Sequence, residues 1–246
     1  MMLSKSDIKR INALKIKKYR NIEGQFIAEG QKIILDLIQA GLSPEILVFT
    51  KIFESVFNHI APHTLRIVSE EELSKISSLK QAPGCLAIFK VPTPPKNIPT
   101  DTWILATDNI QDPGNLGTLI RIADWFGIKN VLCSDDTVDA YNPKVVQATM
   151  GSIAHVHIHY HPLKEWLEQQ VPQRKIYAGL LEGKDIRDVS FAEPGILLIG
   201  NEAKGISHEL LPYISQAVNI PKLGDAESLN AAVAAGIIAS FALLSR

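Results

Sequence analysis

Residues 196–206 read Ile-Leu-Leu-Ile-Gly-Asn-Glu-Ala-Lys-Gly-Ile, so four aliphatic residues run into a loop that contains Gly200 and Gly205. The aliphatic run does not alternate with polar residues, which is typical of a strand buried on both faces. Such strands belong to parallel sheets that carry helices on both sides. The loop follows the carboxyl end of the strand, where open α/β sheets bind ligands. Taken alone, the spacing also fits a simple turn between a strand and a helix.

Strand and helix patterns alternate along the rest of the chain, which favours an α/β fold. In the first part we predict helices at 5–20, 30–41, 51–58 and 70–78, and strands at 25–29, 45–50, 64–68 and 85–91. In the second part we predict strands at 103–108, 130–134, 155–159, 175–180, 196–200 and 217–220, and helices at 115–126, 142–150, 162–170, 206–213 and 228–244. We therefore expect a parallel sheet with helices on both faces, preceded by a small α/β domain.

A proline-rich segment, Val-Pro-Thr-Pro-Pro-Lys-Asn-Ile-Pro-Thr at 91–100, joins the two parts. Proline fixes φ and lacks a backbone donor, so this stretch is expected to be extended and to lie outside the sheet centres. We place the domain boundary there, with one domain at 1–95 and a second at 96–246.

Charge is distributed unevenly along the chain. The net charge at pH 7 is −1, but residues 1–100 contain 14 Lys and Arg against 9 Asp and Glu, whereas residues 101–246 contain 11 against 17. Residues 1–20 hold seven cations, with Asp7 as the one acid. A helix of this kind can lay cations along a phosphate backbone, although solvated lysines on an amphipathic helix give the same pattern. The asymmetry favours a first domain that contacts a polyanion.

The sequence gives no sign of a metal centre, a disulfide framework or a membrane span. Cys85 and Cys133 are far apart and form no metal-binding motif, as in a reduced cytosolic protein. Histidines alternate at positions 155, 157, 159 and 161, but no carboxylate or cysteine stands at supporting spacing. The apolar stretch 228–244 contains several polar residues, so a buried or interface helix is expected there.

The segment that follows the predicted strand 103–108 contains the turn Asp112-Pro113-Gly114. Asn115 stands where the next helix is expected to begin, and we assign it as the helix cap. Arg121 interrupts the apolar face of that helix. A buried or half-buried arginine needs a partner or an anionic ligand, although Arg121 could also point to solvent or to Asp124.

A third segment, residues 218–233, combines the end of a strand at Ile220 with a loop that contains Gly224. Ser228 and Asn230 then open a nearly all-apolar helix. Taken alone, Ser228 is best explained as a helix cap. The chain contains neither the dinucleotide-binding glycine fingerprint nor a P-loop.

In this order and spacing, the three segments resemble the motifs of the SpoU/TrmH family of RNA ribose 2′-O-methyltransferases, in the SPOUT superfamily. The matching residues are Asn115 and Arg121, then Gly200, Asn201, Glu202 and Gly205, then Ile220, Pro221, Gly224, Ser228, Leu229 and Asn230. Residues 5–41 resemble the family's N-terminal substrate-binding domain. Lys222, Ile122 and the pair Ala231-Ala232 depart from the usual pattern.

The resemblance implies an S-adenosylmethionine-dependent enzyme that methylates a ribose 2′-hydroxyl in structured RNA, in the cytoplasm. It implies a C-terminal trefoil knot, which general topology rules would not suggest. It also implies a homodimer with the active site at the subunit interface. The N-terminal domain favours ribosomal RNA over transfer RNA, and neither a metal nor a membrane is implied.

The resemblance also assigns roles to residues. The catalytic set comprises Arg121, Asn115, Glu202, Ser228 and Asn230. The cofactor-binding set comprises Gly200, Asn201, Leu198, Ile220, Gly224 and Leu229. A guanidinium rarely loses its proton, so we interpret Arg121 as an electrostatic clamp on the phosphate and the developing alkoxide, with proton loss assisted by the substrate phosphate.

Three alternatives remain at this point. A tRNA 2′-O-methyltransferase shares the catalytic motifs, and a non-catalytic RNA-binding module could keep the fold. A nucleotide-binding oxidoreductase is a third, but the chain lacks the required glycine fingerprint.

Overall fold

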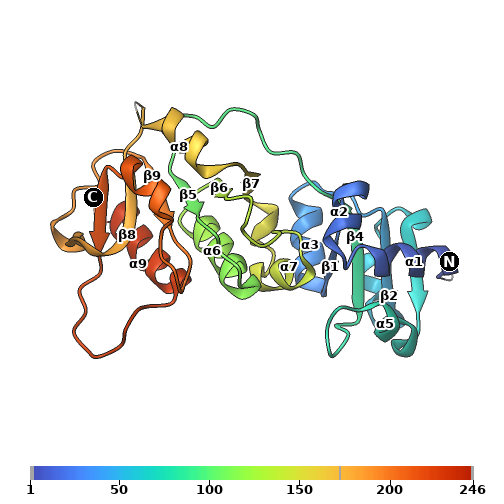
Figure 1. Cartoon of the computed structure of the whole chain (residues 1–246). Coiled ribbons are helices and arrows are strands. Elements are labelled where there is room, and N and C mark those ends of the chain that lie inside the picture. Colours follow the sequence, from blue (N-terminus) through green and yellow to red (C-terminus); the bar gives the residue numbers. More distant parts are fainter. Residues whose placement is uncertain (1–2, 172, 245–246) are drawn as a thin grey trace. The chain divides into compact units, whose positions relative to one another are not determined.

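The computed structural model describes residues 3–171 and 173–244, which form two compact units (Figure 1). The first unit comprises the described residues of 1–92 together with residues 139–155. The second comprises residues 93–138 and the described part of 156–246. Residues 139–155 thus lie with the first unit, although they follow a strand of the second.

The first unit contains a four-stranded mixed sheet. Its order is β1 (Gln25–Glu29), β4 (Cys85–Lys90), β2 (Ile46–Thr50) and β3 (Leu65–Val68), with only β2 and β3 parallel. The accompanying helices are α1 (Lys5–Ala13), α2 (Lys17–Glu23), α3 (Gln31–Gln39), α4 (Glu54–Phe57) and α5 (Glu70–Ile76). Every strand and helix expected before residue 91 has a counterpart here.

The expected single helix over 5–20 is wrong, because the chain breaks into α1 and α2. Ile16 is extended, with φ −104° and ψ 128°. Leu14 and Arg20 are both buried. A straight helix places residues six apart on different faces, so burying both side chains requires a change of direction. The break also leaves the Leu14 carbonyl free to accept a hydrogen bond from Arg20 Nη1, at 2.9 Å.

Residues 139–155 form α7 (Pro143–Thr149) and the short 3-10 helix η3 (Ser152–Ala154). An ion pair fixes the start of this segment to the first unit, because Arg20 Nη2 lies 2.5 Å from Asp139 Oδ2. The rings of Tyr141 and Phe26 are 4.9 Å apart. These contacts, with α7 against β1, explain why the segment clusters with the first unit.

The second unit contains a six-stranded sheet that is parallel throughout, as expected. Its order is β10 (Gln216–Asn219), β8 (Ile176–Asp185), β9 (Ile196–Ile199), β5 (Ile104–Thr107), β6 (Asn130–Cys133) and β7 (His157–Tyr160). All four residues of β9 are buried, in agreement with the unbroken aliphatic run.

Helices cover both faces of this sheet. The apolar side chains of α8 (Leu163–Gln170) and of the 3-10 helix η5 (His208–Tyr213) share one core cluster with alternate strand residues. On the other face, α9 (Ala231–Leu244) packs against β8, β9 and α6 (Pro113–Trp125). Cys85 and Cys133 are free and buried, and burial raises the pKa of each thiol to about 12.

Three local expectations in the second unit are wrong. The cap of α6 is Asp112, whose carboxylate accepts a hydrogen bond from the Asn115 backbone nitrogen, so Asn115 lies inside the helix. The helix expected from Ser228 begins at Ala231, and Asn230 rather than Ser228 precedes it. Residues 208–213 form a 3-10 helix that contains Pro212, which cannot donate an α-helical hydrogen bond.

Arg174 fixes the second half of the proline-rich segment to the second unit. Its guanidinium donates to the carbonyl oxygens of Ile98, Pro99 and Thr102 at 2.8, 2.6 and 3.0 Å. Across residues 3–171 and 173–244, none of the helices has both the length and the apolar character needed to cross a membrane.

Candidate functional site

The three segments singled out from the sequence meet at one edge of the six-stranded sheet. β5 ends at Thr107 and continues into α6, whereas β9 ends at Ile199 and continues into the loop 200–207. Since β5 and β9 are parallel neighbours, both loops leave from the same edge. The loop 221–230 precedes α9, which packs against α6 and thereby reaches the same place.

A hydrogen-bonded cluster joins the three segments. Asn115 Nδ2 donates to Glu202 Oε1 at 2.5 Å, and Asn230 Nδ2 donates to Asn115 Oδ1 at 2.8 Å. Asn230 Oδ1 accepts from the backbone nitrogens of Ala232 and Val233, which caps α9. Both ends of the Asn115 amide are therefore occupied, and its orientation is fixed. We call Asn115, Glu202 and Asn230 the polar cluster.

Glu202 is the member of the polar cluster with a carboxylate oxygen that has no partner among the described residues. Its side chain is half-buried, and Oε1 is occupied by Asn115. Within the described residues, Oε2 accepts no hydrogen bond. A carboxylate oxygen held in place and left open is suited to accept a hydrogen bond from a sugar hydroxyl.

Asn201 holds the loop 200–207 in shape. Its Oδ1 accepts from the backbone nitrogens of Ala203 and Lys204 at 2.9 and 3.0 Å, and its Nδ2 donates to the Asn109 carbonyl at 2.7 Å. These three bonds use the amide from both ends and connect the loops after β9 and β5. In this structure Asn201 is thus a positioning residue for Glu202, its neighbour in the loop.

Gly200 allows this loop to close on itself. A Cβ at Gly200 would lie 2.4 Å from the backbone carbon of Gly205. The close approach at Gly200 is therefore made by the chain's own loop. The buried carboxylate of Asp108 also supports the loop, since its Oδ2 accepts from the Ser207 nitrogen at 2.7 Å. The supporting roles of Asp108 and Asn109 were not predicted, and the available signal was their position directly after the buried strand β5.

Arg121 lies apart from the polar cluster and is exposed, which agrees with the alternative that it points to solvent. It shares an exposed stripe of α6 with Thr118 and Trp125, because residues three and four apart lie on one helix face. In the part of the chain that the structure describes, its guanidinium has neither a hydrogen bond nor an ion pair.

The remaining predicted residues differ in their surroundings. Ser228 and Gly224 are exposed in the loop 221–230, Leu229 is 47% exposed and Ile220 is half-buried. Leu198 is fully buried in the core cluster of the sheet, so only its backbone could reach a ligand.

The loop 221–230 has features that fit a nucleoside cofactor. Among the described residues, the backbone of 221–229 makes no hydrogen bond, so its donors and acceptors are open. Leu223 is 100% exposed and Leu229 is 47% exposed, which leaves apolar surface beside them. Open backbone groups and apolar side chains are what a nucleoside-sized ligand requires.

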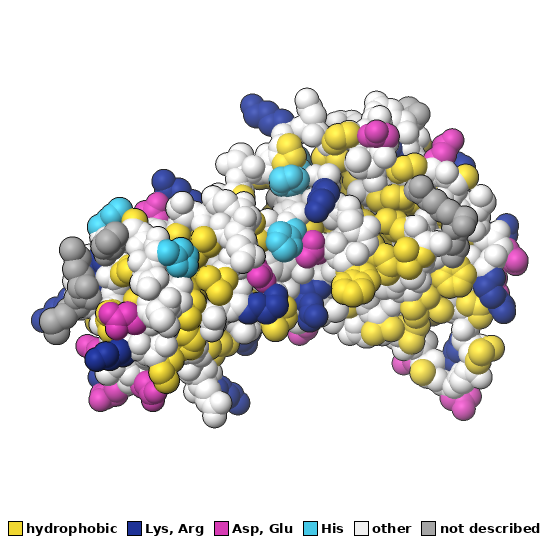
Figure 2. Space-filling view, turned by 180° about the vertical axis from the view of Figure 1, so that it is seen from behind, with side chains coloured by type: hydrophobic (Ala, Val, Ile, Leu, Met, Phe, Trp, Pro, Cys, Tyr) yellow, Lys and Arg dark blue, Asp and Glu magenta, His cyan; other side chains and the backbone are white. Residues whose placement is uncertain are grey.

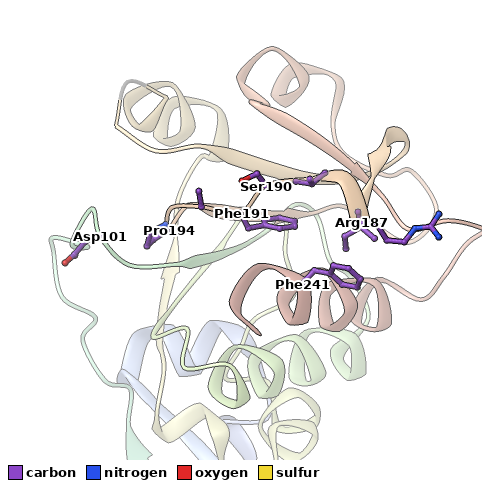
Figure 3. A pocket seen from close by; sticks show the side chains of 9 residues that line it. Asp101, Arg187, Ser190, Phe191, Pro194 and Phe241 are labelled. Atoms are coloured by element: carbon purple, nitrogen blue, oxygen red, sulfur yellow. The ribbon is translucent and has the colours of Figure 1, made fainter. Parts of the chain in front are cut away.

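Two cavities lie in the second unit, and the polar cluster lines neither. One, of about 680 Å³, lies at the amino ends of β5 and β9, at the opposite edge of the sheet. Figure 3 shows the rings of Phe191 and Phe241 within it, whereas Arg187 points outward. The other, of about 250 Å³, is lined partly by Asp108 and Ser207, which support the loop 200–207.

The alternating histidines occupy different environments. His157 and His161 are exposed, whereas His159 is buried and its ring lies 3.0 Å from Asn130 Oδ1. Burial, followed by the neighbouring His161 and His157, lowers the pKa of His159 to about 4. No group of three or more side chains suited to hold a metal ion occurs across residues 3–171 and 173–244.

Models of two known protein families match the two parts of the chain. The model of the SpoU rRNA Methylase family matches residues 102–240, and that of the MRM3-like substrate binding domain matches residues 5–87. The 23S rRNA (guanosine(2553)-2′-O)-methyltransferase of Bacillus subtilis is 31% identical, over 94% of this chain and 93% of that protein. The 23S rRNA (uridine(2479)-2′-O)-methyltransferase of Streptomyces viridochromogenes is 28% identical, over 89% and 82%.

Solved structures show the same architecture. An RNA methyltransferase of the TrmH family from Porphyromonas gingivalis covers 100% of both chains, with 32% identity and a TM-score of 0.89. The AdoMet-bound rRNA methyltransferase of Sinorhizobium meliloti covers 98% of this chain and 96% of its own, with 30% identity and a TM-score of 0.88. A structure that addresses 2-OH methylation of C/U34 on tRNA covers 60% of this chain and all of its own, with 25% identity and a TM-score of 0.53.

Proposed function

The chain belongs to the SpoU rRNA Methylase family, and we propose that its polar cluster serves the transfer of a methyl group from S-adenosylmethionine to a ribose 2′-hydroxyl of ribosomal RNA. The chain is an S-adenosylmethionine-dependent RNA methyltransferase, as the three motifs indicate. The observation that carries the assignment is the cluster of Asn115, Glu202 and Asn230, which joins all three motifs by hydrogen bonds.

When bound, S-adenosylmethionine supplies an electrophilic methyl group. The loop 221–230 and the backbone at Gly200 would hold it through open backbone groups, with apolar contact from Leu229 and Ile220. Glu202 Oε2 would accept a hydrogen bond from a ribose hydroxyl and orient the sugar. Positioning of this kind contributes much of the rate acceleration in bimolecular group transfer.

Arg121 and Ser228 would contact the phosphate beside the target ribose. The guanidinium of Arg121 provides donors in a planar fork that matches a phosphate. Proton loss from the 2′-hydroxyl would then be assisted by the substrate phosphate. The exposure of Arg121 fits a role that begins only when an anionic ligand or a second chain approaches.

A homodimer is part of this proposal, because apolar side chains are exposed on α6 and α9. Trp125 is 85% exposed, and Val233 and Leu244 are 51% and 70% exposed. Val233, Ile237, Phe241 and Leu244 follow helical spacing along one face of α9. Figure 2 shows hydrophobic side chains gathered on the part of the molecule that carries the C-terminal residues. Pairing of two copies would cover this surface.

A C-terminal trefoil knot is also proposed. The sheet order supports it, since β9 lies between β8 and β5, and β10 lies beyond β8. The chain then continues through the loop 221–230 to α9, which packs on α6.

Ribosomal RNA is favoured over transfer RNA by the extent of the matches. The rRNA methyltransferases of Bacillus subtilis and Streptomyces viridochromogenes match 94% and 89% of the chain, whereas the tRNA-directed structure matches 60%. We propose that residues 1–95 bind the RNA and that residues 96–246 carry out the transfer. The enzyme would act in the cytoplasm, a proposal supported by the bacterial relative that is named for methylation of 23S rRNA.

The test is transfer of a labelled methyl group to ribosomal and transfer RNA from a strain that lacks the enzyme. We expect incorporation into ribosomal RNA, and none when the target nucleotide carries a 2′-deoxyribose. Incorporation into transfer RNA alone would show that the substrate assignment is wrong. Arg121→Lys, compared at saturating RNA and cofactor, should lower kcat, and retained turnover would contradict the need for a bidentate fork.

A further inference from the structure

The outer face of α2 exposes an aromatic and an aliphatic side chain next to two lysines. Tyr19 is 41% exposed and Ile22 is 65% exposed, and Lys17 and Lys18 are also exposed. We call Lys17, Lys18, Tyr19 and Ile22 the α2 face. Large apolar side chains on a short surface helix have no role in the core of the first unit.

The orientation of α2 is fixed by its one buried residue. Arg20 is 3% exposed and donates to Asp139 through Nε and to the Leu14 carbonyl through Nη1, at 2.8 and 2.9 Å. At 100° per residue, Lys18 and Ile22 lie on the side of the helix opposite Arg20. Tyr19 is three residues from Ile22 and so is its neighbour on the helix surface. Lys18, Tyr19 and Ile22 therefore form one continuous surface, and the exposed Lys17 lies at its margin, about 100° around the helix from Lys18.

The structure also separates the cations of residues 1–20 into two groups. Arg20 is paired with Asp139, Arg10 lies 3.5 Å from Glu45, and Lys15 donates to the Ser77 carbonyl. Lys5, Lys9, Lys17 and Lys18, by contrast, form no ion pair with any described residue. Three of the seven cations therefore bind groups within the first unit, whereas Lys17 and Lys18 on α2 remain available to a polyanion.

We propose that the α2 face binds unpaired nucleotides of the RNA substrate. A base would stack on Tyr19 beside Ile22, and the flanking phosphates would contact Lys17 and Lys18. Stacking platforms flanked by cations are how proteins hold single strands. Paired bases do not expose their faces, so a duplex would gain only the phosphate contacts. The inference rests on the proposed function, because it assumes an RNA substrate.

Two probes test this on the full-length enzyme: a single-stranded 12-nucleotide oligo(U) and a 12-base-pair RNA duplex. Stacking is worth about 1–3 kcal/mol per base, so Tyr19→Ala should weaken oligo(U) binding by about 5-fold or more. Duplex binding should change less than about 2-fold, and Tyr19→Phe should stay close to wild type on both probes. Ile22→Ala, at a more exposed position, should weaken oligo(U) binding in the same direction.

The lysines have a matched control pair on α1. Lys17→Ala/Lys18→Ala and Lys5→Ala/Lys9→Ala remove the same charge from exposed helix positions. Loss of two phosphate contacts should reduce the salt slope for oligo(U) by about 1.4 in the first pair. Equal slopes in the two pairs would indicate general electrostatics and overturn the proposal. Three further outcomes would also overturn the proposal. Tyr19→Ala and Ile22→Ala could bind oligo(U) with unchanged affinity, or they could change the oligomeric state and not the binding. The wild-type enzyme could also fail to bind oligo(U).

Methyl transfer distinguishes this inference from the proposed function. If the wild-type enzyme methylates ribosomal RNA and the α2 variants bind this RNA normally, the proposed function holds and the proposal for the α2 face is wrong. If the wild-type enzyme binds oligo(U) through the α2 face but methylates no RNA, the proposal for the α2 face holds and the proposed function is wrong.

Discussion

At the residue scale, Asn201 illustrates how a motif residue acquires a different role once its contacts are known. It was assigned to cofactor binding from the resemblance, a role that stays a prediction. Its amide makes three hydrogen bonds within the protein, two inside the loop 200–207 and one to the Asn109 carbonyl. We infer that its main contribution is to hold Glu202 against Asn115.

Asn201→Ala should therefore lower kcat by about 10- to 100-fold, because displacement of an orienting group by about 1 Å can cost that much. The KM for RNA should change little, since Asn201 is occupied within the loop. Steady-state kinetics measure both, and calorimetry measures cofactor affinity. Ala203→Ser, in the same loop at an exposed position, is the control. Normal kcat with weakened cofactor binding would favour direct contact with the cofactor instead.

His159 predicts a pH dependence of stability. Burial, then His161 and His157, lowers its pKa to about 4 in the folded protein, against an ordinary value of 6.5. The unfolded chain therefore binds the proton more readily than the folded chain, so stability falls as pH decreases from about 6.5 to about 4. His159→Gln can keep a hydrogen bond to Asn130 and should make this decline shallower. Thermal unfolding at pH 7.5, 5.5 and 4.5 measures the effect, and parallel curves would contradict it.

At the element scale, most of the fold could be predicted from the sequence, because it depends on periodicity. The aliphatic run of β9 predicted a parallel sheet, and every expected strand is present. The break at Ile16 could not be predicted, because no local breaker residue marks it and burial of Leu14 and Arg20 decides it. The placement of residues 139–155 likewise depends on a pairing between residues 119 positions apart.

That pairing predicts a specific pattern of stability. Asp139→Leu would leave the Arg20 guanidinium buried without its carboxylate, which typically costs about 3–5 kcal/mol. The double variant Arg20→Met/Asp139→Leu should recover much of this loss, because it removes both charges. Glu71→Ala breaks an exposed pair with Lys75 and should change the free energy of unfolding far less than Asp139→Leu does. Chemical unfolding measures all three, and a double variant no more stable than Asp139→Leu would contradict the argument.

At the scale of the whole molecule, the sequence motifs indicated three residues that the structure brings together, but they did not show that Arg121 lies apart from them. Asn115, Glu202 and Asn230 come together because their three segments converge at one sheet edge. Arg121, on the same helix as Asn115, lies on a different face, beside the exposed Trp125. A sequence pattern cannot distinguish a residue that completes its own chain's site from one that completes the site of another copy.

The exposed stripe of α6 predicts that Arg121 completes the site of another copy of the chain. If the stripe pairs with another copy, Arg121 of one subunit would serve the polar cluster of its partner. Arg121→Ala and Asn230→Ala should each be inactive alone, yet mixed dimers of the two should regain activity. In such a dimer one site combines both substitutions and the other carries neither. Methyl transfer after subunit exchange measures the recovery, and its absence in dimers verified to be mixed would place Arg121 in the site of its own chain.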